Sequence, residues 1–430
     1  MKRNLLKTYI CIVMVAVLLM LNSSVIFAQT SSKEKVDVTI KTERQLRNFL
    51  DDVSRGNSYT GRVIKLAKDI QVDCTGTNTW TLHSAGDDKN IFAGTFDGSG
   101  HTISGIVAYD GNVKGMQLGG LFGSVAKSGT IMNLTIEKCN YASKAKSFAM
   151  IAGENYGTIK NCKIKDCKIT CDMWASGVTG HNYGIIEDCT ADAAITFSCY
   201  CVAGITTFND GKILNCSFGG SFSDYAFTGT QYMEIQAIDI AAYNNGMIQN
   251  CFGYGKASLT NNKSAHYTIT CFADKYKSIV RNCYYSEEVS DGAYRDFQGI
   301  IDNVQACTLE EMQSKTFVEK LNRTKGKSLA WMLNGEQEYP VHVDVNEVTF
   351  SLLDAKKGYV KSSCSYATNG DTVKLTTYLN KNYKLKKIAA KTASGKKVRL
   401  TKGKNGTYTF KMPNEEVIVT TSVVKKSGRR

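Results

Sequence analysis

The middle of the chain repeats one short pattern of polar and apolar positions. Residues 155–162 read NYGTIKNC, and related octets occupy 182–189, 209–216 and 244–251. Each octet has an Asn and a Gly ahead of an isoleucine and ends on Asn or Asp followed by cysteine. Aligned on their glycines, with an earlier copy at Gly129, the octets recur after 28, 27, 27 and 35 residues. A repeat of this length predicts a solenoid, whose units bury their apolar faces only by stacking on one another.

The apolar spacing inside each repeat predicts strands rather than helices. The first set is Ile131, Leu134 and Ile136, and the matching set one repeat later is Ile159, Cys162 and Ile164. In each set, two residues separate the first two apolar positions and one residue separates the last two. This spacing indicates a strand, a bend and a second strand. Asn or Asp occupies each bend, where these residues tolerate left-handed backbone angles. The bend residues are Asn133, Asn161, Asp188, Asn215, Asn250 and Asn282.

A glycine precedes each of these isoleucines by two residues, and we expect it to supply a positive φ. Short strands, bends and a period near 27 together predict an all-β fold. We expect a right-handed parallel β-helix of about seven coils over residues 91–306, with helical caps at its two ends. Equivalent residues of neighbouring coils should lie in columns, about 4.8 Å apart. An N-terminal cap and first coil are predicted over 29–90, where Thr42 begins a short amphipathic helix. A C-terminal cap is predicted over 307–345 because residues 308–322 have helical spacing.

The composition changes near residue 346. Seven alternating runs separated by Gly, Asn or Lys turns predict a small antiparallel β-sandwich over 346–424, followed by a basic tail at 425–430. Residues 346–430 carry 19 Lys and Arg against 5 Asp and Glu, whereas residues 29–345 carry 31 against 34. This asymmetry predicts an anionic partner for the sandwich, such as cell-wall polymer or acidic glycan. The alternative is a solvated surface that only keeps the domain soluble.

The candidate anionic-partner patch is the run of basic residues in the middle of the sandwich. It comprises Lys384, Lys386, Lys387, Lys391, Lys396, Lys397 and Arg399. No nucleic-acid partner is expected.

The N-terminus has the pattern of a secretory signal peptide, assigned to residues 1–28. Three basic residues precede an apolar run from Tyr9 to Leu21, and a small residue, Ala28, closes the segment. We therefore expect an extracellular protein, secreted or non-covalently attached to the cell surface, with no stable membrane insertion after cleavage. The alternative is an uncleaved anchor, although the run is short for spanning a bilayer.

Cysteines recur at one position of the repeat. The predicted structural core column contains Cys162, Cys189, Cys216, Cys251 and Cys283, and Leu134 and Ile106 are assigned to it in earlier coils. We interpret these thiols as small buried hydrophobic groups. Disulfides between neighbouring coils are the alternative. No metal site or cofactor is predicted, because paired CxxC motifs are absent and the chain has only five histidines.

No catalytic residues are predicted from the sequence. The acidic residues of the repeats are scattered, and although Asp166 and Asp192 fall close in register, no third acid or arginine joins them. Exposed aromatic residues are the better candidates, because aromatic rings bury apolar area against sugar rings. The predicted ligand-binding residues are Tyr156, Trp174, Tyr183 and Tyr200. Their alternative role is packing on the shoulder of the rod.

Two parts of the chain resemble known families. GENYGTIKNCKIKDCKI and TGHNYGIIEDCTADAAI resemble the GLUG motif of bacterial surface proteins, and FAGTFDGSGHTISGI resembles the segment that precedes such repeats in pectin-lyase-like β-helices. One departure is cysteine where the motif often has serine or an apolar residue. GDTVKLTTYLNKNYKLKKI and the F-x-M-P-x-x-x-V ending from Phe410 to Val417 are similar to bacterial repeat domains related to internalin B-repeats, which are non-catalytic.

These resemblances and the charge asymmetry favour one function over two others. The first is a secreted or cell-surface binding or adhesion protein, whose rod presents loops and whose basic module holds an anionic wall polymer or glycan. The second is a carbohydrate-active enzyme, a polysaccharide lyase or a glycosidase, built on the β-helix. The third is a structural spacer with no specific ligand.

Overall fold

The computed structural model describes residues 36–75, 80, 83–85, 91–109, 118–143, 147–225, 235–260, 264–273, 277–324, 330–333, 339–343, 346–350, 356–364, 366–367, 369–413 and 415–426. The predicted signal peptide and the end of the basic tail lie outside the described residues. Within the described residues, no helix combines the length and the apolarity needed to cross a bilayer.

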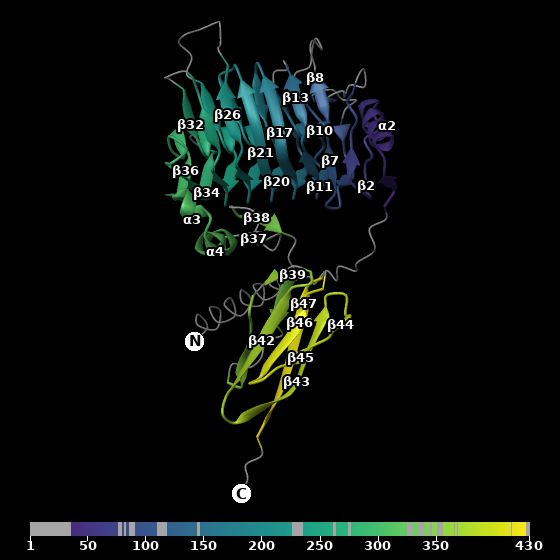
Figure 1. Cartoon of the computed structure of the whole chain (residues 1–430), viewed down its shortest axis with the longest axis vertical. Coiled ribbons are helices and arrows are strands. Elements are labelled where there is room, and N and C mark those ends of the chain that lie inside the picture. Colours follow the sequence, from purple (N-terminus) through teal and green to yellow (C-terminus); the bar gives the residue numbers. More distant parts are fainter. Residues whose placement is uncertain are drawn as a thin grey trace, which may run out of the picture. The chain divides into compact units, whose positions relative to one another are not determined.

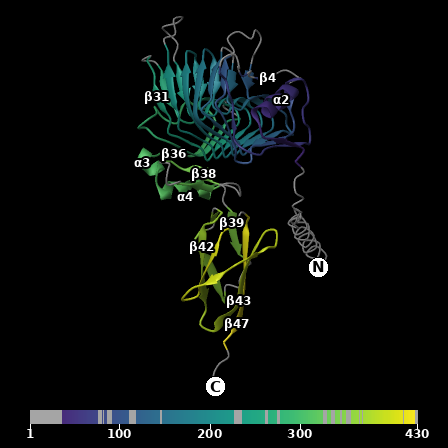
Figure 2. The same ribbon diagram turned by 45° about the vertical axis from the view of Figure 1, so that its right-hand side comes forward.

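From β1 to β36 the described chain winds through three sheets, so the predicted parallel β-helix is confirmed (Figures 1 and 2). The strands before and after each Asn bend belong to one long sheet. Its strands are β1 (Val38–Ile40), β2 (Val63–Leu66), β3 (Ile70–Gln71), β6 (Thr95–Asp97), β7 (Thr102–Ser104), β8 (Val107–Tyr109), β11 (Thr130–Met132), β12 (Thr135–Glu137), β13 (Asn140–Ser143), β16 (Thr158–Lys160), β17 (Lys163–Cys171), β20 (Ile185–Glu187), β21 (Thr190–Phe197), β24 (Lys212–Leu214), β25 (Ser217–Phe218), β26 (Ser221–Asp224), β29 (Met247–Gln249), β30 (Phe252–Gly253), β31 (Lys256–Ser258), β34 (Ile279–Tyr285) and β36 (Ile300–Ala306).

Two shorter sheets complete each coil. The eight-stranded sheet contains β5 (Ile91–Phe92), β10 (Phe122–Val125), β15 (Ala152–Asn155), β19 (Thr179–Asn182), β23 (Thr206–Asn209), β28 (Ala241–Asn244), β33 (Thr270–Ala273) and β35 (Tyr294–Asp296). The seven-stranded sheet contains β4 (His83–Ala85), β9 (Leu118–Gly120), β14 (Ser147–Ala149), β18 (Trp174–Ser176), β22 (Cys201–Ala203), β27 (Gln236–Ile238) and β32 (Ala265–Tyr267). β4 pairs antiparallel with β9, whereas the other described pairs of the β-helix are parallel.

The predicted bends are present with the expected backbone. All six bend residues have positive φ, from 49° at Asn161 to 56° at Asn250. The glycine prediction is wrong, because the glycines of the octets are not among the described residues with positive φ. They are required by close stacking instead. A Cβ added to Gly184 would lie 2.1 Å from the carbonyl oxygen of Gly157 in the preceding coil.

A polar ladder runs inside the coils beside the apolar core. The side-chain nitrogen of the leading Asn in the first three octets donates to the side-chain oxygen of the Asn one coil later: Asn155 to Asn182 at 2.9 Å, Asn182 to Asn209 at 2.8 Å, and Asn209 to Asn244 at 2.7 Å. In the fourth octet Asn244 donates to the Ser278 hydroxyl at 2.6 Å. These amides are at most 1% exposed. Because each buried amide finds its partner in the next coil, the ladder fixes the register of the stack.

Both ends of the β-helix are covered. Helix α2 (Glu43–Ser54) begins at Thr42, whose hydroxyl accepts from the Gln45 backbone nitrogen, and it lies beside the first coils (Figure 2). Its Phe49 packs against Phe92 and Phe96 with ring centroids 5.9 and 5.6 Å apart. Near the last coils lie α3 (Leu309–Met312) and α4 (Lys315–Arg323), and the hairpin of β37 (Ala330–Met332) and β38 (Val341–Val343) runs back against the bends of the middle coils.

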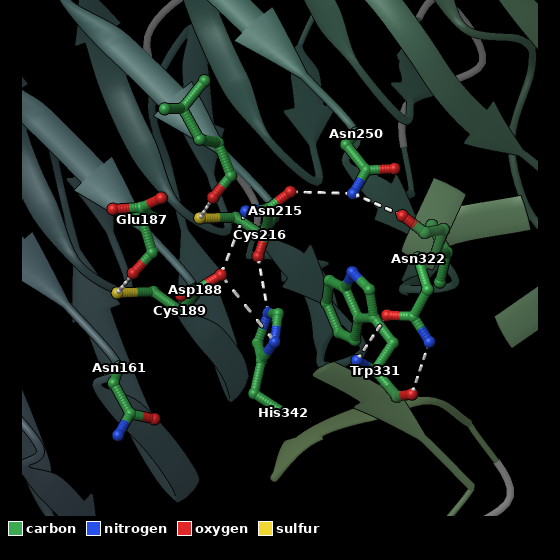
Figure 3. A network of polar contacts seen from close by, with 12 residues as sticks. Asn161, Glu187, Asp188, Cys189, Asn215, Cys216, Asn250, Asn322, Trp331 and His342 are labelled. Atoms are coloured by element: carbon green, nitrogen blue, oxygen red, sulfur yellow. Dashed lines mark hydrogen bonds and ion pairs between the residues drawn. The ribbon is translucent and has the colours of Figure 1, made fainter. Parts of the chain in front are cut away.

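The hairpin is held to the bend residues by polar contacts (Figure 3). His342 Nε2 lies 2.7 Å from the Asn215 carbonyl oxygen, and its Nδ1 lies 3.9 Å from Oδ1 of Asp188. Trp331 is fully buried against His342, with ring centroids 3.6 Å apart. The cap therefore combines a buried aromatic ring with hydrogen bonds to the bends.

The C-terminal part forms a second core of its own. One sheet contains β39 (Asn346–Phe350), β41 (Tyr366–Ala367), β43 (Tyr383–Thr392), β44 (Lys397–Val398) and β47 (Val417–Lys425). The other contains β40 (Gly358–Ser362), β42 (Thr372–Leu379), β45 (Thr401–Lys402) and β46 (Thr407–Lys411). The described pairs are antiparallel except that β39 pairs parallel with β47. Val373, Leu375 and Phe410 are among the residues that fill the space between the sheets.

Candidate functional site: an aromatic surface on the β-helix

One column of the eight-stranded sheet carries an aromatic ring in successive coils. The register places His181 beside Phe208, Phe208 beside Tyr243, and Tyr243 beside Phe272. Ring centroids lie 4.4 Å apart for the first pair and 4.9 Å for each of the next two, and those two pairs are nearly parallel, at 11° and 19°. Each of these side chains is half-buried. The spacing equals one coil, so the rings continue the backbone stack outward.

More aromatic side chains lie where this sheet adjoins the seven-stranded sheet, outside the main core. A small apolar cluster, separate from the main core, is formed by Cys201, Ala203, Ile238, Ala242 and Cys271. Five half-buried rings pack against it: Trp174, Tyr200, Tyr243, Tyr267 and Phe272. We call these five rings, with His181 and Phe208, the aromatic surface. The Tyr243 hydroxyl is hydrogen-bonded to the Cys201 thiol, which anchors the ring across the two sheets.

The four predicted ligand-binding residues divide into a pair and two separate rings. Tyr156 and Tyr183 stack with centroids 4.7 Å apart and planes 7° apart, and their exposed fractions are 44% and 42%. Trp174 instead meets the edge of Phe208 at 5.0 Å, and Tyr200 stacks on Phe272 at 5.9 Å. The structure thus brings together the tyrosine pair, and sets Trp174 and Tyr200 against rings that the sequence analysis did not single out.

The missed residues had a signal in the sequence. His181, Phe208 and Tyr243 each directly precede the Asn of an octet. This position holds Glu154 before the first octet and a ring before each of the next three octets. The octets were aligned from their Asn onward, so the position before the Asn did not enter the prediction.

Acidic groups and a histidine lie beside the tyrosine pair. Glu154 and His181 are neighbours in register. Burial raises the pKa of Glu154, and a hydrogen bond from the Tyr156 hydroxyl partly offsets this rise in pKa. Burial lowers the pKa of His181, against the opposing charge of Asp210. His181 Nδ1 lies 3.3 Å from the Tyr183 hydroxyl. Such a set offers ring faces together with hydrogen-bonding groups, as saccharide ligands require.

The predicted cysteine column lies in the core. Cys162, Cys189, Cys216, Cys251 and Cys283 are each 0% exposed. The thiol of Cys189 lies 3.3 Å from the Glu187 carbonyl oxygen and 3.7 Å from that of Ile159, and its neighbours repeat this arrangement. Burial raises the pKa of Cys162, Cys216 and Cys283, which disfavours the reactive thiolate. The fourteen cysteines of the described chain are free thiols rather than disulfides.

The scattered acids do not assemble into a larger group. Burial and the neighbouring Asp166 raise the pKa of Asp192, and Lys165 opposes this rise in pKa. Lys165 itself pairs with Glu137 at 3.1 Å. Among the residues that the structure describes, no three His, Cys, Asp or Glu side chains are grouped so that they could hold a metal ion.

The predicted basic patch lies on one sheet of the sandwich. All seven of its residues are exposed, and they come from β43, β44 and the adjoining turns. The register of β43 on β47 shifts between Leu385 and Lys387. Such a bulge reverses the alternation of the strand. As a result Lys384, Lys386 and Lys387 are all exposed, while Leu385 and Ile388 are half-buried.

Comparison with known proteins gives limited matches. No protein-family model matches the chain. Halomucin from Haloquadratum walsbyi is 30% identical over 115 residues, which is 25% of this chain, and the chain spans about 1% of the length of halomucin. A crystal structure from Bacteroides ovatus, described as a candidate immunoglobulin A1 protease, aligns with 71% of this chain and 91% of its own, at 15% identity and a TM-score of 0.49.

Proposed function

We propose that this protein is a secreted, cell-surface-associated bacterial protein that binds glycans. The β-helix is a GLUG-type scaffold for the aromatic surface, and the sandwich is a module of the internalin B-repeat kind that holds an anionic wall polymer or acidic glycan. The observation that carries the proposal is the aromatic surface, which presents half-buried rings coil after coil on the outside of the two shorter sheets.

The aromatic surface supports glycan binding for a physical reason. Soluble proteins normally bury large rings in the core, and an outward group of rings beside polar residues is typical of a binding surface. Here the rings line up along the coil axis, which suits an extended chain of repeating units. Glu154, His181 and the tyrosine hydroxyls supply hydrogen-bonding groups at one end.

The sandwich supports a separate, electrostatic contact. Its predicted patch has seven exposed basic side chains, of which Lys396 lies 3.4 Å from a carboxylate oxygen of Glu415. Attraction between such a face and a polyanion falls as salt screens the charges.

The first test addresses the contact of the sandwich, within the full-length secreted chain. Retention on immobilised teichoic acid or polyuronate is measured between low and high salt, for the native protein and for a variant with Lys384, Lys387 and Lys391 changed to Gln. We expect salt-sensitive retention that the variant loses. Retention that ignores salt, or that the variant keeps in full, contradicts the anionic-partner proposal. If the native protein binds no glycan on a glycan array, the result favours the structural-spacer alternative.

A second candidate function has one specific observation in its favour. Glu154 and His181 are adjacent, and the pKa of Glu154 is raised while the pKa of His181 is lowered. A neighbouring carboxyl group and imidazole are side chains that can serve as a general acid and a general base. The enzyme alternative, a polysaccharide lyase or glycosidase, predicts new reducing ends or unsaturated products that the His181→Ala variant fails to release.

A further inference from the structure

The tyrosine pair ends in open ring faces. Backbone bonds place Ala126, Tyr156, Tyr183 and Asp210 at the same position of four successive coils: Tyr156 N donates to Val125 O, Tyr183 N to Asn155 O, and Asp210 N to Asn182 O. Between them the two rings cover one face of each other. In this register Ala126 precedes Tyr156 and Asp210 follows Tyr183, so neither end of the pair is continued by another ring at this position. The exposed fractions of 44% and 42% show that both tyrosine side chains reach solvent.

The charged groups that act on these tyrosines are carboxylates. After burial, the pKa of Tyr156 is raised by Glu154, and the pKa of Tyr183 is raised by Glu154 and Asp210. Asp210 is oriented by Asn245, whose Nδ2 donates to Oδ1 at 3.2 Å. Carboxylates accept strong hydrogen bonds from hydroxyl groups and repel other carboxylates at short range.

We propose that Tyr156 and Tyr183 form a subsite for uncharged pyranose units, with Glu154 and Asp210 accepting hydrogen bonds from the sugar hydroxyls. The sugar ring stacks on an outer phenol face, where it buries apolar area. This subsite therefore selects neutral sugars, whereas the sandwich selects polyanions. The inference rests on the proposed glycan-binding function of the β-helix and names the ligand class of one part of it.

The chain offers a matched control. Tyr359 and Tyr378 in the sandwich also stack, with centroids 4.8 Å apart and planes 20° apart, and they are 58% and 46% exposed. They lie in the basic part of the chain, with Lys361 nearby in sequence on the same strand. Stacking and exposure are thus similar in the two pairs, and the acidic neighbours belong to the first pair.

The test titrates the full-length secreted protein with maltohexaose, mannohexaose and xylohexaose as neutral probes and with hexagalacturonate as the anionic probe. Binding is measured by calorimetry and by tyrosine fluorescence, and unfolding temperatures check that each variant is folded. We expect binding of at least one neutral probe, weakened about tenfold or more by Tyr156→Ala or Tyr183→Ala and unchanged by Tyr359→Ala. We also expect Glu154→Gln to improve binding of hexagalacturonate to the β-helix.

Three outcomes overturn the inference. One is stronger binding of hexagalacturonate than of every neutral probe at this pair, which would point to the exposed Lys127 beside Ala126. Another is loss of neutral binding in Tyr359→Ala but not in Tyr183→Ala. A third is no binding of any neutral probe. Salt-sensitive retention on polyanions is measured on the same variants. If the sandwich acts as proposed, this retention stays intact in each of these cases, so a failure of the tyrosine subsite is distinguishable from a failure of the proposed function of the sandwich.

Discussion

His266 Nε2 lies 2.8 Å from Oδ1 of Asp239 in the core of the β-helix, where the two side chains are 4% and 0% exposed. The other ring nitrogen, Nδ1, lies 2.8 Å from the Val289 carbonyl oxygen. A carbonyl oxygen only accepts, so Nδ1 carries a hydrogen, and a further proton lies between Nε2 and the carboxylate. The pair therefore keeps this proton when the chain folds, and the backbone nitrogen of His266 adds a bond to Asp291.

This pair predicts a loss of stability as pH rises. Burial raises the pKa of Asp239, and although burial alone lowers the pKa of His266, the Asp239 carboxylate and the Val289 bond raise that pKa overall. Both folded pKa values thus exceed the ordinary ones, 3.8 and 6.5. The folded state therefore holds protons that the unfolded state releases. The stabilisation from Asp239 declines as pH rises above its ordinary pKa of 3.8, and that from His266 declines as pH rises above its ordinary pKa of 6.5.

The measurement is the urea midpoint between about pH 6 and pH 9, followed for the native protein and for Asp239→Asn with His266→Gln together. We expect the midpoint of the native protein to fall across this range and that of the double variant to fall less. Equal slopes for the native protein and the double variant contradict the prediction.

The amide ladder predicts a large cost for removing one of its members. Asn182 accepts from Asn155 and donates to Asn209 and to the Lys212 carbonyl oxygen, so Asn182→Ala removes three hydrogen bonds, two of them between fully buried amides. We expect a loss of about 3 kcal/mol or more in the free energy of unfolding. Asn245→Ala, at a half-buried position with one bond to Asp210, should cost about 1 kcal/mol or less. A similar small loss in both variants would show that the ladder does not hold the coils.

Close stacking predicts that Gly184→Ala is poorly tolerated. Its new Cβ would lie 2.1 Å from the Gly157 carbonyl oxygen, so two coils must move apart. We expect a loss of about 3 kcal/mol or more, seen as a fall in the unfolding temperature. The comparison is Gly56→Ala, where φ is 103° but nothing lies within 4 Å of the new Cβ. That change should cost only backbone strain, about 1–2 kcal/mol, and a reversed order of the two variants would refute the steric explanation.

Burial of the cysteine column predicts selective labelling. A maleimide reagent should modify the partly exposed Cys74 and Cys364 in the native protein. The five fully buried thiols of the column should react only after unfolding, because reagent and water do not reach them. Mass spectrometry of peptides from native and denatured samples checks the pattern. Rapid labelling of Cys216 under native conditions would mean that the coils open or that the column is not buried.

The periodic part of the fold was predictable because the repeat carries the register. Ile131, Ile159 and Ile186 were aligned by glycine spacing alone, and they are partners in adjacent strands. The left-handed bends followed from the intrinsic tolerance of Asn and Asp. Both properties belong to single residues or to their spacing, so one sequence suffices to show them.

Properties that depend on a neighbouring coil were not predictable in this way. The octet glycines are needed because of a carbonyl oxygen 27 or more residues away, which no local rule reveals. The earliest coil was also placed out of phase. Ile103 pairs with Ile136, so Ile106 lies level with Cys139 and not with Cys162. Its strands had no full octet from which to set the register.

The candidate site was half predicted for a related reason. The tyrosine pair lies at a repeated position of the octets, where spacing alone suggests contact. Tyr200 and Phe272 meet across two sheets and two coils, with ring centroids 5.9 Å apart. The octet spacing aligns equivalent positions of one sheet and does not relate positions on two different sheets.

The place where the repeat lengthens has a practical consequence. Phe197 pairs with Asp224 and Cys201 with Gln236, so the interval between these partners grows from four residues to twelve while the strands on both sides keep their register. The whole difference between a 27-residue and a 35-residue repeat thus falls in the segment between Asp224 and Gln236. Foreign peptides inserted in this segment should therefore be tolerated without changes to the rest of the sequence, which makes it a suitable insertion site for protein engineering and a place where evolution can change the chain.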